Sequence, residues 1–169
     1  MVECQKCLDP TSFGLFLVAT VSLPLAILQL LQPDGMAWLP TSQFFILLGL
    51  LILVVAMLAY RSDANFGFVV FGLVGAAVTM TGLGMGFYEN LTFAFMFVLA
   101  IIWSIFAKTP KNLSLILVTT TLVFLFVGLS GIIEGDYWHW LIGLAALFNF
   151  LFNIYMAFAL ALENKLPIF

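Results

Sequence analysis

Charged side chains are scarce in this sequence. They make up 8% of its 169 residues, whereas hydrophobic residues make up 64% and the mean hydropathy is +1.23. A soluble domain has about 25% charged residues, enough to cover the surface that it turns to water. This chain could not cover such a surface, so we expect lipid to surround most of it. The apolar content also leaves no stretch for a separate soluble catalytic domain.

Histidine and cysteine are also rare. The sequence has one histidine, His139, and two cysteines, Cys4 and Cys7, spaced as C-x-x-C. That spacing suits zinc or a redox pair, but no second pair supplies further ligands, so a reduced cytoplasmic tail is the favoured interpretation. A single histidine without a neighbouring nucleophile makes a poor catalytic triad. We therefore expect no metal, no cofactor and no enzymatic activity.

Hydrophobic runs long enough to cross a membrane are plentiful. About 20 apolar residues span the hydrocarbon core. Six segments meet this length, and they run over residues 12–31, 39–60, 66–88, 91–107, 113–133 and 139–162. Only Glu89 and Asn90 separate the third segment from the fourth, which predicts a tight turn there. The sequence thus predicts an all-α, polytopic membrane protein whose single domain, residues 1–169, has six transmembrane helices.

Positive charge is confined to one side of this topology. The basic residues fall in the two tails and in the second and fourth loops; they are Lys6, Arg61, Lys108, Lys111 and Lys165. Basic residues favour the cytoplasmic side of a membrane. We therefore expect both termini in the cytoplasm and the protein in the plasma (inner) membrane. The net charge of -3 resides in loops and tails, and we expect no nucleic-acid partner.

Ionisable residues are absent from the middle of every predicted span. Proton pumps and ion-coupled carriers usually need such a group at mid-membrane depth. Its absence favours a passive pathway, or helices that pack with no pathway at all. The sequence leaves both interpretations open.

Uncharged polar residues do occur inside the spans. Asn149 and Asn153 are spaced i, i+4 on one face of the sixth predicted helix, and lipid could not satisfy their amides. They either hydrogen-bond to other helices or line a polar path. The fifth helix has a threonine run at 119–121, whose hydroxyls bond their own helix or face a lumen. Our candidates for a polar pathway are Thr20, Thr79, Thr121, Asn149 and Asn153.

Small residues form a stripe on the third predicted helix. The stripe consists of Gly72, Gly75, Ala76, Thr79, Gly82 and Gly86. Small faces let helices approach closely in lipid, and this is the favoured explanation. They could also leave room for a narrow pore.

Two short motifs resemble those of the succinate–acetate permease family, also called acetate uptake transporters. The run Asp9-Pro10-Thr11-Ser12-Phe13-Gly14-Leu15 is similar to the family's Asn-Pro-Ala-Pro-Leu-Gly-Leu type motif, with Asp and Ser in place of the Asn and the second Pro. The run Asn65-Phe66-Gly67, which follows Tyr60-Arg61-Ser62-Asp63-Ala64, is similar to the family's Asn-Thr-Phe-Gly. The matching positions are Asp9, Pro10, Gly14, Asn65, Phe66 and Gly67. The resemblance implies a six-helix protomer in a homo-hexamer, each protomer passing acetate or a similar small carboxylate.

The resemblance also implies where the pathway narrows. The family's constriction uses Phe, Tyr and Leu from the first, third and fifth helices, and these positions correspond to Val18, Val74 and Leu122. Only the leucine is retained. Two valines in place of aromatic residues imply a wider and wholly aliphatic neck.

A second family has a local similarity. Some urea and amide channels carry a Glu-Gly-Asp-Trp-Trp loop near a late helix, and the run Glu134-Gly135-Asp136-Tyr137-Trp138 resembles it. Three functions therefore compete. The leading one is a channel or facilitator for acetate or a similar small carboxylate. The others are a urea or short-amide channel and a structural membrane subunit without a pathway.

Overall fold

Six α-helices account for most of the chain. The structure, a computed structural model, describes residues 10–31, 42–162 and 167. The helices are α1 (Thr11–Leu31), α2 (Ser42–Arg61), α3 (Asn65–Gly82), α4 (Phe87–Phe106), α5 (Lys111–Ser130) and α6 (Tyr137–Ala161). Each is long and apolar enough to cross a membrane, and no strand occurs in the described ranges. The predicted all-α, six-span membrane fold is confirmed, whereas Cys4, Cys7 and Asp9 lie outside the described residues.

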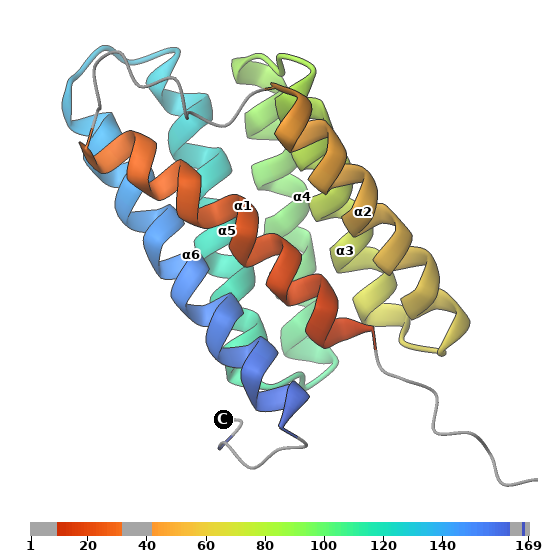
Figure 1. The fold of residues 1–169 in the computed structure, drawn as a ribbon. Coiled ribbons are helices and arrows are strands. Elements are labelled where there is room, and N and C mark those ends of the chain that lie inside the picture. The colour runs from red at the N-terminus through yellow and green to blue at the C-terminus, as the bar shows by residue number, and fades with distance from the viewer. Residues whose placement is uncertain (1–9, 32–41, 163–166, 168–169) are drawn as a thin grey trace, which may run out of the picture.

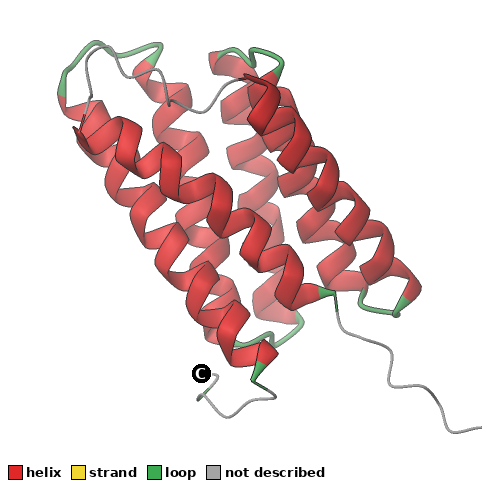
Figure 2. Cartoon of the chain, viewed as in Figure 1, coloured by secondary structure: helices red, strands yellow, loops and turns green. Residues whose placement is uncertain are grey.

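The helices run alternately up and down and pack as close pairs, α2 with α3, α1 with α6, and α4 with α5 (Figure 1). Further contacts join α5 to α6 and α1 to α2. Loops connect the helices at both ends of the bundle (Figure 2). The start of α1 and the end of α6 lie at the same end, which also holds Arg61 and Lys111 at the termini of α2 and α5.

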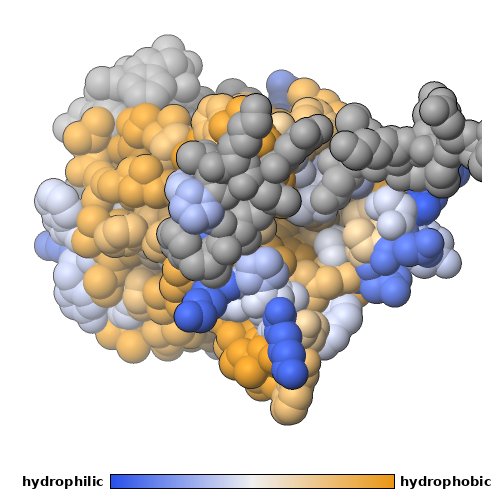
Figure 3. All heavy atoms as spheres, turned by 90° about the horizontal axis from the view of Figure 1, so that it is seen from below, coloured by the Kyte–Doolittle hydropathy of each residue, from blue (hydrophilic) through white to orange (hydrophobic). Residues whose placement is uncertain are grey.

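The surface of the bundle is apolar. Large hydrophobic side chains are exposed on all six helices, and Leu47, Met57, Phe95 and Leu144 are examples. A view from the end where α1 begins shows hydrophobic atoms over much of the molecule and hydrophilic atoms in separate patches (Figure 3). A soluble monomer rarely exposes so much contiguous apolar surface, so this surface fits lipid or another apolar partner.

Glycines set the close packing of α2 against α3. A Cβ on Gly75 would lie 2.9 Å from the backbone nitrogen of Leu53, and one on Gly49 would lie 2.6 Å from the backbone nitrogen of Thr79. Gly72, by contrast, has open space around the same position. Much of the small-residue stripe therefore packs against α2, in agreement with the favoured interpretation.

The turn between α3 and α4 lies earlier than predicted. α3 ends at Gly82 rather than at Tyr88, and residues 83–86 form the turn. Gly84 has φ +90°, a left-handed conformation that suits glycine. Gly86 is the N-cap of α4, not a member of the α3 stripe, and Glu89 and Asn90 lie in the first turn of α4. Hydropathy misplaced this turn because apolar side chains alternate with its glycines, so the run stays apolar while the backbone leaves the helix.

Candidate functional site

Two cavities lie inside the bundle. The upper cavity, toward the end of the bundle where α1 ends, has a volume of about 180 Å³ and is lined by residues from all six helices. The lower cavity, toward the end where α1 begins, has a volume of about 130 Å³ and is lined by α1, α3, α5 and α6. Each is well above the ~10–15 Å³ that one water molecule needs. The two cavities share a wall, which consists of Val18, Val74 and Thr120.

Two of the three predicted neck residues, Val18 and Val74, lie in this shared wall. Leu122 is half-buried and lines neither cavity. From α5, Thr120 occupies the wall and Phe124 lines the upper cavity. Residues 120 and 124 are one turn apart on the same face of a helix, whereas residue 122 points about 200° away from residue 120.

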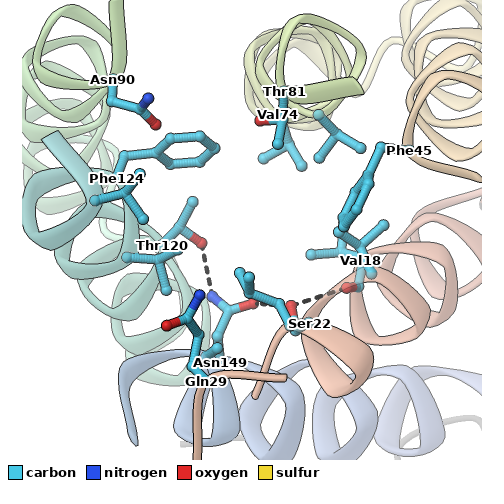
Figure 4. A pocket seen from close by; sticks show the side chains of 16 residues that line it. Val18, Ser22, Gln29, Phe45, Val74, Thr81, Asn90, Thr120, Phe124 and Asn149 are labelled. Atoms are coloured by element: carbon cyan, nitrogen blue, oxygen red, sulfur yellow. Dashed lines mark hydrogen bonds between the residues drawn. The ribbon is translucent and has the colours of Figure 1, made fainter. Parts of the chain in front are cut away.

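Asn149 ties three helices together beside the upper cavity. Its Nδ2 donates to Thr120 Oγ1 at 2.7 Å and to Thr119 Oγ1 at 3.0 Å, both on α5. Its Oδ1 accepts from Ser22 Oγ of α1 at 2.7 Å. Figure 4 shows Asn149 between Thr120 and Ser22 at the floor of this view. The Nδ2 and the Oδ1 of Asn149 therefore both have hydrogen-bond partners on other helices, as expected if this residue links helices.

The threonine hydroxyls bond their own helix. Thr120 Oγ1 donates to Ile116 O at 2.8 Å, and Thr121 Oγ1 donates to Leu117 O at 2.8 Å. Thr120 therefore presents a lone pair, which Asn149 occupies, rather than a proton. These threonine hydroxyls bond their own helix, which was one of the two interpretations of the run, and Thr120 also lines both cavities.

Asn153 lines the lower cavity and is fully buried, at 0% exposure. Its Nδ2 donates to Asn149 O at 2.8 Å and to Asn149 Oδ1 at 3.0 Å. Its Oδ1 has no hydrogen-bond partner. An orphaned buried acceptor costs about 1–3 kcal/mol, so the fold holds an acceptor beside the lower cavity at a cost in stability.

The remaining predicted polar residues lie away from both cavities. Thr20 is exposed, and its hydroxyl donates to Phe16 O at 2.8 Å. Thr79 donates to Gly75 O at 2.8 Å and packs against Gly49 of α2. Neither these two nor Thr121 is among the residues that line the cavities. Of the five candidates, Asn149 and Asn153 reach a cavity.

Polar residues that the sequence did not single out also line the upper cavity. They are Ser22, Gln29, Thr81 and Asn90, and Thr120 of the threonine run lines the cavity beside them. The positions of Val18, Ser22, Leu25 and Gln29 give a signal that could have found two of them, because they repeat at one-face helical spacing along α1. His139 Nδ1 lies 2.8 Å from Gln29 Oε1, which links α6 to α1 beside this cavity.

The positions that carry the motif resemblance cluster near the lower cavity. Phe66 and Gly67 line it, and Asn65 is exposed at the start of α3. Pro10 is buried just before α1. A Cβ on Gly14 would lie 2.6 Å from the Phe71 ring and 2.8 Å from Val55 Cγ1, so this glycine makes room for side chains of α3 and α2.

Charge is kept away from both cavities. The charged residues within the described ranges lie at helix termini or in loops, and none of them lines either cavity; they are Arg61, Asp63, Glu89, Lys108, Lys111, Glu134 and Asp136. The same ranges contain no group of three His, Cys, Asp or Glu side chains that could hold a metal ion. The cavity walls therefore offer uncharged polar groups and aliphatic or aromatic surface.

Comparison with known proteins finds similarity in structure alone. No protein-family model matches the chain, and no curated protein matches it in sequence. A solved structure, that of the bacterial acetate channel SatP, superposes with a TM-score of 0.83 over 95% of this chain and 98% of the channel, at 15% sequence identity. At this identity the likeness establishes the fold, so the six-helix fold that the permease resemblance implied is confirmed: this chain has the fold of the SatP channel.

Proposed function

We propose that the protein is a membrane channel or facilitator for acetate or a similar small carboxylate. The observation that carries the proposal is the pair of internal cavities whose linings share Val18, Val74 and Thr120. The shared fold with an acetate channel supports the same function. A structural subunit without a pathway would have no need of two internal cavities that share lining residues.

The pathway is passive. No charged side chain of the described ranges lines a cavity, so no ionisable group there could carry a coupling proton through the membrane. The neck, made by Val18 and Val74 with Thr120 from α5, offers nothing to replace the hydration shell of an inorganic ion. Small solutes that lose their hydration water at little cost pass through the neck, whereas hydrated ions are excluded.

The setting of this pathway follows from the charges and from the resemblance. Both termini lie in the cytoplasm of a plasma (inner) membrane, because the basic residues within the described ranges, Arg61, Lys108 and Lys111, lie at that end of the bundle. The upper cavity then opens toward the outside and the lower cavity toward the cytoplasm. The protomers form a homo-oligomer, a hexamer by resemblance, and the apolar surface of the bundle supports association. Mass measurement in mild detergent tests this, and a monomer as the sole species contradicts it.

Uptake into proteoliposomes tests the function. Purified protein is reconstituted, and uptake of labelled acetate and of labelled urea is compared with uptake by protein-free vesicles of the same lipid. The proposal predicts acetate uptake well above the protein-free value and above urea uptake. Urea uptake alone would favour the amide-channel alternative. No uptake of either solute would favour a structural subunit.

A further inference from the structure

An open apolar groove runs between α5 and α6, outside both cavities. Its volume is about 590 Å³, and it is lined by the beginning of α5 and the second half of α6. Four of its large apolar side chains are between 41% and 49% exposed; they are Leu115, Leu151, Phe158 and Leu162. Exposed apolar side chains around a hollow indicate an apolar occupant.

The groove has the length of one leaflet of a bilayer. Its α6 side extends from Leu151 to Leu162, the C-cap of that helix. At a rise of 1.5 Å per residue these two residues lie about 17 Å apart along the helix axis. One leaflet of a hydrocarbon core about 30 Å thick is about 15 Å deep. The groove therefore reaches from one membrane surface to near the middle of the bilayer, as a single hydrocarbon chain of a phospholipid does.

Positive charge lies at the surface end of this groove. Lys111 is the first residue of α5 and precedes the groove residue Leu115 by one turn on the same face. Lys108 lies in the turn before α5, and both lysines are exposed. The start of α5 and the end of α6 line the groove together, at the end of the bundle where α1 begins (Figure 1). Asp63, the acidic residue of the described ranges at this end, lies between α2 and α3, which do not pack directly against α5.

The uncharged polar groups of the groove are enclosed or engaged. Asn112 Nδ2 is buried out of reach of an occupant. Tyr155 donates its hydroxyl proton to Pro167 O at 2.7 Å. Polar recognition at the groove therefore depends on the two lysines at its end. A phosphate group has the matching charge, and lysine binds phosphate as a point charge.

We propose that the groove is a binding site for a phospholipid of net negative charge. One hydrocarbon chain lies along α6 between Leu151 and Leu162, and the phosphate lies at Lys111 and Lys108. Basic pockets between transmembrane helices bind anionic headgroups in this way. The lipid supports the contact of α5 with α6 beyond the point where Asn149 joins the two helices. The site is independent of the transport function proposed above, because it shares no lining residue with either cavity.

Native mass spectrometry of the full chain in mild detergent measures the binding. Phosphatidylglycerol is compared with phosphatidylcholine of the same chains, and with glycerol phosphate, which has the charge without the chains. Each lysine near the membrane surface contributes about fivefold to the affinity for an anionic lipid. Phosphatidylglycerol should therefore bind at least tenfold more tightly than phosphatidylcholine, and glycerol phosphate should not bind. Equal affinities for the two lipids, or glycerol phosphate bound as tightly as phosphatidylglycerol, would overturn the proposal.

A matched pair of charge substitutions tests the headgroup contact. Lys111→Gln and Arg61→Gln each remove one positive charge from the same end of the bundle, and Arg61 ends α2, away from the groove. Lys111→Gln should lower the affinity for phosphatidylglycerol about fivefold and leave that for phosphatidylcholine unchanged. Arg61→Gln should change neither. The same loss in both variants would mean general attraction to the basic end of the protein, and the proposed site would be wrong.

A second pair tests the hydrocarbon contact. Leu115→Trp fills part of the groove, whereas Leu47→Trp makes the same change on the exposed surface of α2. Both positions are exposed, so neither substitution disturbs the core. Leu115→Trp should weaken the binding of phosphatidylglycerol and of phosphatidylcholine alike, and Leu47→Trp should weaken neither. Unchanged binding in Leu115→Trp would show that the chain does not lie in this groove.

Two other occupants would be recognised by their own results. A variant that ends at Leu162 and binds phosphatidylglycerol, when the full chain does not, would identify the C-terminal tail as the occupant. A Leu151→Cys variant, with Cys4 and Cys7 changed to serine, would cross-link between copies and bind no lipid if a second copy filled the groove. Either result overturns the lipid site.

Discussion

At the scale of single residues, Asn149 shows how a polar group is used deep in an apolar bundle. Its side chain is 3% exposed and bonds to α1 and α5, while Asn153, one turn further along α6, donates to it. Removal of such a hub leaves several buried partners unsatisfied. The contribution of Asn149 is therefore to the stability of the fold.

Asn149→Leu is expected to lower the free energy of unfolding by about 1–3 kcal/mol, the usual cost of orphaned buried partners. Thermal unfolding in detergent measures this as a fall in Tm. Leu144→Ala serves as the control on the same helix, because Leu144 is exposed on the apolar surface. A Tm equal to that of the unmodified protein would show that the network contributes nothing to stability.

Sequence reasoning found this network in part, for a physical reason. Asn149 and Asn153 are conspicuous because lipid cannot satisfy an amide. Ser22 escaped notice, and Thr121 rather than Thr120 was chosen from the run 119–121, because hydroxyls are common in membrane helices and usually bond their own backbone. What distinguishes these two is Asn149, whose amide reaches across from another helix. Such a partnership depends on how three helices are set against one another, which the sequence pattern does not reveal.

At the scale of helices, the contact of α2 with α3 depends on missing side chains. Gly75 faces the backbone of α2, whereas Gly72, on the same helix, faces open space. The two glycines look equivalent in the sequence, since both belong to one small-residue stripe. In the structure they differ, because a Cβ added to Gly75 would contact the backbone of α2 and one added to Gly72 would contact nothing within 4 Å.

Gly75→Ala is expected to destabilise the protein by about 1–3 kcal/mol, since its Cβ would lie 2.9 Å from Leu53 N and backbone must shift. Gly72→Ala meets nothing within 4 Å, and alanine is the better helix former, so its Tm should be unchanged or slightly higher. Thermal unfolding of the two variants in parallel makes the comparison. Equal effects on Tm would rule out close α2–α3 packing at Gly75.

The helices themselves were predictable, and their ends were less so. Hydropathy identifies six spans because each needs a long apolar run. It does not report backbone conformation, which is why the α3–α4 turn at 83–86 was misplaced. The neck shows the same limit, since the family resemblance implied Leu122 whereas Thr120 is the α5 residue that lines both cavities. Residues two positions apart on a helix lie on opposite faces, and apolar composition alone does not show which of them faces the cavities.

At the scale of the whole molecule, the fold is shared with an acetate channel at 15% identity. Apolar outer surfaces and small residues between helices meet the packing requirement with many different sequences. The fold therefore leaves selectivity to a few residues inside the bundle. It also leaves the orientation in the membrane to the distribution of charge.

A reporter fused after Phe169 and active only in the cytoplasm is expected to be active, because Arg61, Lys108 and Lys111 lie at the same end of the bundle as the end of α6. The same reporter inserted into the loop at Glu134–Asp136 should be inactive. The reverse pattern would show that the protein has the opposite orientation in the membrane, with the lower cavity toward the outside and the upper cavity toward the cytoplasm.

The most direct test of the account is a block at the neck. Val74→Phe places a ring in the wall between the cavities, and Val54→Phe makes the same change on the exposed face of α2. Both variants are reconstituted at equal protein content, after their Tm values show that they fold. Labelled acetate uptake by Val74→Phe should fall about tenfold or more, since ~1.4 kcal/mol of added barrier gives that factor. Uptake by Val54→Phe stays at the unmodified value. A folded Val74→Phe protein that takes up acetate as fast as the unmodified protein would contradict a pathway through this wall.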